Sequence, residues 1–203
     1  MSSILVKETF SDEVKLNFGA FLKPMKNDEF LQLSRDNQDV QIEMNKNGDL
    51  IIMPGTGGLT GRKNAKLIAR LVIWTEQDAS GVAFDSDTIF CLPNGAKKIP
   101  DASWVSNEKW NALSEEEQDK IVPFAPDFAI ELRSRTDSLK ELQDKMQEYI
   151  ENGVSLGWLI DAGTRTVYVY RQNAEVETLE NPNEISGEPL LKGFVLNLKE
   201  IWE

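Results

Sequence analysis

Between residues 40 and 53, the alternation of apolar and polar side chains predicts a β-hairpin. From Val40 to Met44 every second residue is apolar, which is typical of a strand with one buried face. A turn near Asn47 is followed by a second apolar run at 50–53. Because the turn carries the Asn-Gly pair that tight hairpins favour, the two runs are expected to pair antiparallel.

Helical spacing of apolar residues predicts three main helices. A short helix is expected at 27–33, with Asn27 as its N-cap. A longer helix is expected near 61–79, directly after the glycine-rich loop PGTGGLTG. A third is expected at 138–152, where Ser138 can cap the first turn.

The remaining apolar segments predict strands, at 82–92, 99–105, 127–133, 156–160 and 166–171. Strands that alternate with helices in this order indicate an α/β or α+β fold, with a mixed β-sheet flanked by helices and an N-terminal β-hairpin extension. The chain has 203 residues and no internal repeat or evident linker, so we expect one domain over 1–203, with 1–26 as an N-terminal extension.

The composition is that of a globular protein, with 40% hydrophobic and 28% charged residues. No apolar run approaches the roughly 20 residues that a membrane-spanning helix needs. The first residues, MSSILVKETFSDE, lack the basic start and apolar run of a signal peptide. We therefore expect a cytoplasmic location and no membrane association.

Two residue counts narrow the possible chemistry. The chain has no histidine, which excludes an imidazole general base and the Ser-His-Asp and Cys-His arrangements. Cys91 is the only cysteine, so neither an intrachain disulfide nor a cysteine zinc cluster can form. Catalysis must therefore use carboxylates, Lys, Tyr, Ser or Thr, or a hard metal ion held by oxygen ligands.

The charged residues give two opposing indications. The chain has 34 acidic and 22 basic residues, and the net charge of −12 disfavours non-specific binding of nucleic acid. In contrast, Arg62, Lys63, Lys66 and Arg70 lie on one predicted helix with no acid among them. They form either part of a basic cleft for DNA or a solvated helix face, and the sequence leaves both interpretations open.

Asp101 and Glu131 are the first candidates for a metal site. Asp101 is at the start of one predicted strand, and Glu131 is on the less apolar face of the next, at 127–133. If these strands are neighbours, the two carboxylates can converge, and hard oxygen ligands select Mg²⁺ or Mn²⁺. The alternative is that each carboxylate belongs to a solvated strand face.

Lys145 is predicted at the border of the apolar face of the 138–152 helix. From there its stem can cover apolar surface while its ammonium reaches toward the carboxylates. A positive charge at that place would orient an attacking water and offset developing phosphate charge. Alternatively, Lys145 pairs with Glu141 or Glu148 on its own helix.

Several segments resemble, in their order along the chain, the bacterial Uma-type family of putative restriction endonucleases, which belongs to the PD-(D/E)XK nuclease superfamily. They are PDASWVS, PDFAIELRSRTDSLKELQDKMQEYIENG and LGWLIDAGTRTVYVYR, together with MPGTGGLTGRKNAKLIARL and FDSDTIFCLPNGAKKIPDASW. The resemblance runs from about residue 27 to the C-terminus. It implies a restriction-endonuclease-like fold with a nuclease core at about 60–172.

The resemblance also implies roles for individual residues. Asp101 matches the acid of the PD motif and Glu131 matches the second acid, so both would bind Mg²⁺ or Mn²⁺ together with the Leu132 backbone carbonyl. Many superfamily members place a lysine two residues after the second acid, where this chain has Arg133. The Uma-type pattern has a lysine on the next helix instead, and Lys145 matches it.

Glu43 matches a further acid of the family, with a supporting role in catalysis. The chain departs from the family at Ser134-Arg135-Thr136, where Ser-Pro-Ser is usual. It also has Asn64 near the place where the first core helix often begins with histidine. These departures concern activity and cleavage preference more than the fold.

The sequence therefore favours a metal-dependent endonuclease that hydrolyses DNA phosphodiester bonds, and the family resemblance implies a homodimer. The candidate DNA contacts are Arg62, Lys63, Lys98 and Arg133. One alternative is a nuclease-fold protein that binds DNA or a protein partner without cutting. Another is a nucleotide-binding enzyme that uses the glycine loop at 55–61, although its register departs from the dinucleotide fingerprint.

Overall fold

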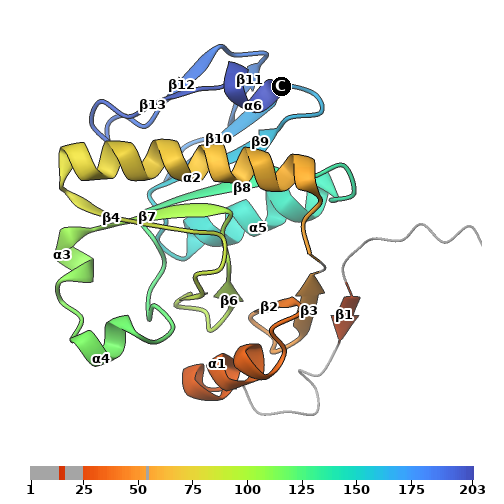
Figure 1. Cartoon of the computed structure of the whole chain (residues 1–203), viewed down its shortest axis with the longest axis vertical. Helices are drawn as coiled ribbons and strands as arrows, with labels where there is room; N and C mark the ends of the chain where they lie inside the picture. The colour runs from red at the N-terminus through yellow and green to blue at the C-terminus, as the bar shows by residue number, and fades with distance from the viewer. Residues whose placement is uncertain (1–13, 17–24, 54) are drawn as a thin grey trace, which may run out of the picture.

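The computed structural model describes residues 14–16, 25–53 and 55–203, which form two main β-sheets with helices around them (Figure 1). The helices are α1 (Asn27–Asp36), α2 (Gly58–Asp78), α3 (Asn107–Trp110), α4 (Glu115–Gln118), α5 (Leu139–Glu151) and α6 (Lys199–Trp202).

The five-stranded sheet has the order β1-β3-β2-β6-β5, formed by β1 (Val14–Leu16), β2 (Gln41–Met44), β3 (Leu50–Met53), β5 (Phe90–Cys91) and β6 (Lys97–Lys98). The six-stranded sheet has the order β11-β10-β9-β8-β7-β4, formed by β4 (Gly81–Phe84), β7 (Ala102–Ser106), β8 (Phe128–Arg133), β9 (Leu156–Asp161), β10 (Thr166–Arg171) and β11 (Glu177–Glu180). A small third sheet pairs β12 (Glu184–Ser186) with β13 (Val195–Asn197).

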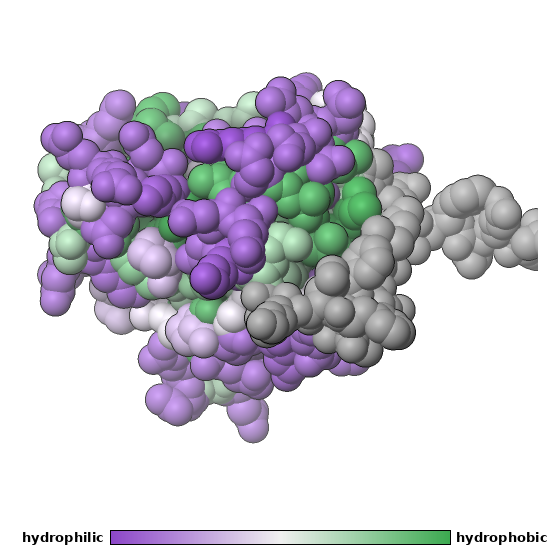
Figure 2. Space-filling model, turned by 90° about the horizontal axis from the view of Figure 1, so that it is seen from below, coloured by the Kyte–Doolittle hydropathy of each residue, from purple (hydrophilic) through white to green (hydrophobic). Residues whose placement is uncertain are grey.

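The five-stranded sheet is built on the predicted hairpin. β2 and β3 pair antiparallel, with Glu43 opposite Ile51, so the hairpin prediction is confirmed. α1 covers this sheet by packing Phe30 into an apolar cluster with Ile42 and Met44. Figure 2 views the molecule from the α1 end and shows hydrophilic side chains over much of this face, with a hydrophobic area beside the residues drawn in grey.

The N-cap predicted for the first helix is wrong by one residue. Asn27 is the first residue of α1, and Lys26 is at the N-cap position. The backbone N–H of Lys26 donates to Glu29 Oε2 at 2.9 Å. A carboxylate in the first turn therefore satisfies a backbone donor at the helix start, and no side chain of the Ser, Asp or Asn type is needed there.

The six-stranded sheet has α2 on one face and α5 on the other (Figure 1). On the α2 face, Ile130 and Trp158 pack with Leu67 in the largest apolar cluster. On the α5 face, Ala129 packs with Met146. The predicted alternation along the 127–133 strand is therefore confirmed, and a mixed α+β fold with flanking helices is confirmed with it.

The segment predicted as one strand at 82–92 forms two strands in different sheets. β4 ends at Phe84 in the six-stranded sheet, and β5 begins at Phe90 in the five-stranded sheet. Asp85 ends the first strand because its carboxylate accepts hydrogen bonds from the Asp87 N–H and the Thr88 hydroxyl. Such a side-chain turn competes with continued strand pairing.

The next predicted strand, 99–105, is also divided between the sheets. β6 ends at Lys98 in the five-stranded sheet, and β7 begins at Ala102 in the six-stranded sheet. Asp101 therefore lies where the chain passes from one sheet to the other. Among the described residues, no helix has the length and apolar character needed to cross a membrane.

Candidate active site

Asp101 is held by hydrogen bonds from strand β8 and from helix α2, which covers the six-stranded sheet. β7 and β8 pair antiparallel with Ala102 opposite Ile130, and this register, continued by one residue, brings Asp101 opposite Glu131. The Leu132 N–H donates to Asp101 Oδ2 at 2.7 Å, and Asn64 Nδ2, on α2, donates to Asp101 Oδ1 at 2.7 Å. Asp101 directly precedes β7, Glu131 is on β8, and these two strands are neighbours, as the proposed convergence requires.

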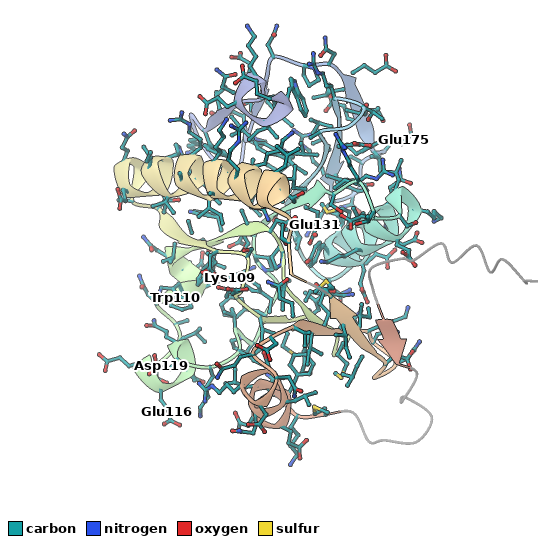
Figure 3. All side chains as sticks on the ribbon, turned by 45° about the vertical axis from the view of Figure 1, so that its right-hand side comes forward. Lys109, Trp110, Glu116, Asp119, Glu131 and Glu175 are labelled. Atoms are coloured by element: carbon teal, nitrogen blue, oxygen red, sulfur yellow. The ribbon has the colours of Figure 1, made fainter. Side chains whose placement is uncertain are left out.

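Glu131 is 4% exposed and points toward α5. Its Oε1 accepts a hydrogen bond from the Tyr149 hydroxyl at 2.9 Å and is 2.9 Å from Lys145 Nζ. Lys145 and Tyr149 are one helical turn apart, so they present both groups on the same side of α5. Figure 3 shows Glu131 between the beginning of α2 and α5.

Glu43 brings the five-stranded sheet into the same cluster. Lys145 Nζ is 2.7 Å from Glu43 Oε1 and 2.9 Å from Glu131 Oε1, so one ammonium joins carboxylates from both sheets. Glu43 also accepts a hydrogen bond from the Ile99 N–H at 2.9 Å. The alternative partners of Lys145 on its own helix are not used. We call Asp101, Glu131, Glu43, Lys145 and Tyr149 the carboxylate cluster.

Lys98 extends the carboxylate cluster on the side of the hairpin. It is 4% exposed, and its Nζ is 3.5 Å from Glu43 Oε2 and 3.2 Å from Glu148 Oε2. A buried ammonium needs such carboxylate partners, because an unpaired charge in the interior is costly. The two lysines and the acids that they contact therefore form a continuous chain of ion pairs.

Burial and local charge shift the acids in different directions. Burial raises the pKa of the Glu131 carboxyl to about 8, against the opposing effect of Lys145. Burial also raises the pKa of Asp101, although the Leu132 N–H and Lys145 favour its ionised form. For Glu43, burial acts to raise the pKa, but Lys145 and Lys98 outweigh it and the pKa is lowered. Glu43 is therefore the anion that most firmly keeps its charge.

Lys145 and Tyr149 are hydrogen-bond donors in this environment. Burial acts to lower the pKa of Lys145, but Glu131 and Glu43 outweigh it, so the pKa is raised and the ammonium stays protonated. Burial and the charge of Glu131 raise the pKa of the Tyr149 phenol well above its usual value. Neither group is suited to accept a proton near neutral pH. Both are suited to orient Glu131.

The donor set fits a magnesium-type ion. Within residues 25–53 and 55–203, no group of three or more His, Cys, Asp or Glu side chains is arranged to hold a metal ion. Mg²⁺, however, keeps several waters and commonly binds proteins through one or two carboxylates, which Asp101 and Glu131 supply. Asn64 Oδ1 is buried beside Asp101 with no partner in the described chain, and it can accept a hydrogen bond from an ordered water there.

The predicted DNA contacts are distributed over two environments. Arg62 is exposed near the start of α2, and Lys63 beside it is buried. Lys98 is held by its two carboxylate partners, and Arg133 Nη1 is 2.7 Å from Asp161 Oδ2. Arg62 and Lys63 therefore lie at the beginning of α2, whereas Lys98 and Arg133 are committed to ion pairs within the fold.

Sequence reasoning missed two side chains that contact the acids. Tyr149 is not among the predicted site residues, yet its hydroxyl donates a hydrogen bond to Glu131 Oε1. Asn64 was noted only as a departure from the family, and its amide binds Asp101. A signal for Tyr149 was its position one turn after Lys145 on the same face. No local pattern marks Asn64, because its contact joins residues far apart in sequence.

The glycine loop does not have the surroundings of a dinucleotide site. β3, which precedes the loop, pairs antiparallel with both β1 and β2. Dinucleotide sites of this kind lie in a βαβ unit, where the helix joins two parallel strands. The loop at 55–61 therefore leads into α2 without forming such a unit.

Comparisons with known proteins identify a family and a fold. A family model described as Uma2, putative restriction endonuclease, matches residues 27–199. Among solved structures, the chain is similar to a putative nuclease belonging to DUF820 from Anabaena variabilis ATCC 29413, with a TM-score of 0.72 and 23% identity. The match covers 88% of this chain and 98% of that chain, and it supports the fold alone. No curated protein matches the sequence.

Proposed function

The chain belongs to the Uma2 family of restriction-endonuclease-like proteins, and we propose that it is a Mg²⁺- or Mn²⁺-dependent endonuclease that hydrolyses phosphodiester bonds in DNA. One observation carries the proposal. Asp101 directly precedes β7 and Glu131 is on the neighbouring β8; burial and the charge of Asp101 raise the pKa of Glu131, and Lys145, from the following helix, acts on both acids. We further propose a homodimer and a cytoplasmic location, as the family resemblance and the sequence led us to expect.

Asp101, Glu131 and the Leu132 backbone carbonyl are the proposed metal ligands. A divalent cation at this place would supply Lewis acidity toward a phosphate oxygen and an attacking water. The protein holds Asp101 through the Leu132 N–H and the Asn64 amide, and it holds Glu131 through Tyr149 and Lys145. Each carboxylate is therefore positioned from two sides before substrate arrives.

Lys145 is proposed to act as a cation and not as a base. Its raised pKa keeps the ammonium protonated, so it can orient a water and offset charge that develops on the phosphate. Glu43, with its lowered pKa, is proposed to keep Lys145 in place from the other sheet. Arg133 is proposed as a DNA contact only through its exposed part, because its guanidinium already pairs with Asp161.

The test is cleavage of supercoiled plasmid by the purified full chain with Mg²⁺, Mn²⁺ or EDTA. Loss of a metal ligand removes several kcal/mol of transition-state stabilisation, so Asp101→Asn and Glu131→Gln are each expected to lower the rate at least ~100-fold. Asp119→Asn is the matched control, since it removes one negative charge on the side of α4, far from Glu131 in Figure 3. Circular dichroism checks that each variant is folded.

The same variants separate the enzyme from its non-cutting alternative. Unchanged metal-dependent cleavage by folded Asp101→Asn would refute the proposed site. Wild-type protein that binds DNA but shows neither cleavage nor calorimetric binding of Mn²⁺ would instead support a nuclease-fold protein that binds without cutting.

A further inference from the structure

Five basic side chains gather where α2 begins and the strands β8 and β9 end. We call Arg62, Lys63, Lys66, Arg135 and Arg165 the cation group. Three of them lie on α2, Arg135 lies in the loop after β8, and Arg165 lies in the turn between β9 and β10. The chain as a whole carries a net charge of −12, so this concentration of positive charge is a local feature.

The fold explains why these three segments meet. β8 and β9 are parallel with Arg133 opposite Asp161, so the loops that follow them begin side by side at the C-terminal ends of the two strands. Asp101 accepts hydrogen bonds from Asn64 on α2 and from Leu132 on β8, which ties the beginning of α2 to that edge. Figure 1 shows the loop after β8 beside the first turns of α2.

Lys63 is the unusual member of the cation group. The residue is 7% exposed and makes no hydrogen bond or ion pair within the described chain, so its stem is covered while its ammonium nitrogen keeps contact with solvent. Burial lowers its pKa, and the charges that add most to this effect are all positive, from Arg62, Lys66, Arg135 and Arg165. The buried Lys97 and Lys98, in contrast, each have an oxygen partner within the fold.

The other members are also free to bind a ligand from outside. Arg62, Arg135 and Arg165 are exposed, and their side chains have no ion pair or hydrogen bond in the part of the chain that the structure describes. Lys66 Nζ donates to the Glu200 backbone carbonyl at 2.6 Å, which leaves its charge uncompensated by that contact. Like charges held together in this way repel, and an added anion relieves the repulsion.

The glycines at the beginning of α2 have open space around them among the described residues. A Cβ atom placed on Gly57, Gly58 or Gly61 would meet no atom within 4 Å. The first turn of α2 contains no acidic residue, so the positive end of the helix dipole is not neutralised by its own side chains. These features add to the attraction that the five side chains exert on an anion.

We infer that the cation group is a phosphate-binding subsite, which holds a backbone phosphate of the nucleic acid strand next to the carboxylate cluster. The inference deepens the proposed function, because it assigns Arg135 and Arg165 to substrate binding and gives the buried Lys63 a ligand. Arg135 belongs to the Ser-Arg-Thr segment where the chain departs from its family. At this place the departure adds a positive charge for the strand.

The test measures binding without cleavage, in EDTA. Fluorescence anisotropy measures the affinity of the protein for a labelled DNA duplex. Thermal unfolding measures the melting temperature in inorganic phosphate and in chloride at equal ionic strength. Arg135→Gln and Arg165→Gln are each expected to weaken DNA binding roughly fivefold and to reduce the salt slope by about 1, as expected for one lost phosphate contact. Arg35→Gln, which removes an exposed arginine of α1, should bind as the wild type does.

Inorganic phosphate is expected to raise the melting temperature of the wild type more than chloride does, and the double variant R135Q/R165Q should lose this difference. Wild-type DNA affinity and salt slope in both single variants would overturn the inference. Stabilisation by inorganic phosphate that depends on the two arginines, without any effect of the variants on DNA binding, would overturn the assignment to a nucleic acid strand.

This outcome is distinguishable from failure of the proposed nuclease. Asp101→Asn protein, which should not cleave, is expected to show the same dependence of DNA binding on Arg135 and Arg165. If the wild type never cleaves DNA but its binding depends on both arginines, the subsite stands and the catalytic proposal fails. If cleavage is metal-dependent and both variants bind DNA as the wild type does, the catalytic proposal stands and the subsite fails.

Discussion

The carboxylate cluster and the cation group lie near the same end of β8 in the six-stranded sheet. Charges are paired in the first and unpaired in the second. In the carboxylate cluster, Lys145 stands between Glu43 and Glu131, and Asp101 receives two hydrogen bonds. In the cation group, Lys63 is buried among positive charges and has no partner in the described chain.

The difference separates charged side chains that are paired within the protein from charged side chains that remain available to a ligand. Buried ion pairs that are mutually satisfied hold their own geometry, whereas removing one partner leaves an uncompensated charge in the interior. The carboxylate cluster is therefore ordered before any ligand binds. In the proposed subsite, an anion from the substrate supplies the charge that the cation group lacks.

The largest effect is expected from removing the Lys145 ammonium, which contacts both Glu43 and Glu131. Lys145→Met should lower the free energy of unfolding by about 3–5 kcal/mol at neutral pH, because buried Glu131 loses its ammonium partner and buried Glu43 keeps only the longer pair with Lys98. Urea unfolding measures the change. Lys140→Met, on the exposed side of the same helix, removes a surface pair with Asp144 and should cost under about 1 kcal/mol. A similar small loss in both variants would show that the cluster is not held by its charges.

A pH series sharpens the comparison for Glu131. Its pKa is raised by burial to about 8, so between pH 4.5 and 8 the folded protein keeps a proton that the unfolded chain releases. Without metal, the contribution of this group to stability therefore falls as pH rises through that range. A metal ion competes with the same proton, so affinity for Mn²⁺ should rise up to roughly tenfold per pH unit below pH 8.

Calorimetric titration at pH 6, 7 and 8 measures this affinity and the proton released on binding. Glu131→Gln should remove the pH dependence together with most of the affinity. Affinity that is constant over these three pH values would contradict a protonated Glu131 in the free protein.

The smallest expected effect comes from Tyr149. Tyr149→Phe removes one hydroxyl donor from Glu131 and leaves Lys145 in place, so it should cost about 1–2 kcal/mol of stability. Because the hydroxyl orients a proposed metal ligand, Mn²⁺ affinity should fall by roughly tenfold as well. Tyr168→Phe is the matched control, since Tyr168 lies on β10 and its hydroxyl does not donate a hydrogen bond to Glu131. Unchanged Mn²⁺ affinity in Tyr149→Phe would limit Tyr149 to packing.

Much of the fold was predictable because it depends on short-range patterns. The hairpin at 40–53, the long helix that became α2 and the two faces of β8 all follow from the period of apolar residues. The family was predictable from the motifs, and the match over residues 27–199 confirms it. The convergence of Asp101 and Glu131 depended on the assumption that their strands are neighbours, which they are.

The rest depends on contacts between residues far apart in sequence. The 82–92 segment has the composition of one strand, but Asp85 folds back on Asp87 and divides it between two sheets. Glu43 contacts Lys145 only because the two sheets pack together. The surroundings of Lys63 likewise come from loops after β8 and β9, which no periodicity of α2 reveals.

The bridge that Lys145 makes between Glu43 and Glu131 has a consequence for how the molecule comes apart. One ammonium contacts acids from both sheets, so separating the sheets would break the shorter ion pair of Glu43 and leave that carboxylate with Lys98 alone. The hairpin sheet is therefore not an optional attachment to the part that carries the candidate acids. We expect both to melt in a single cooperative transition, and a chain shortened to begin at α2 would lose the ion pair between Lys145 and Glu43 along with its hairpin.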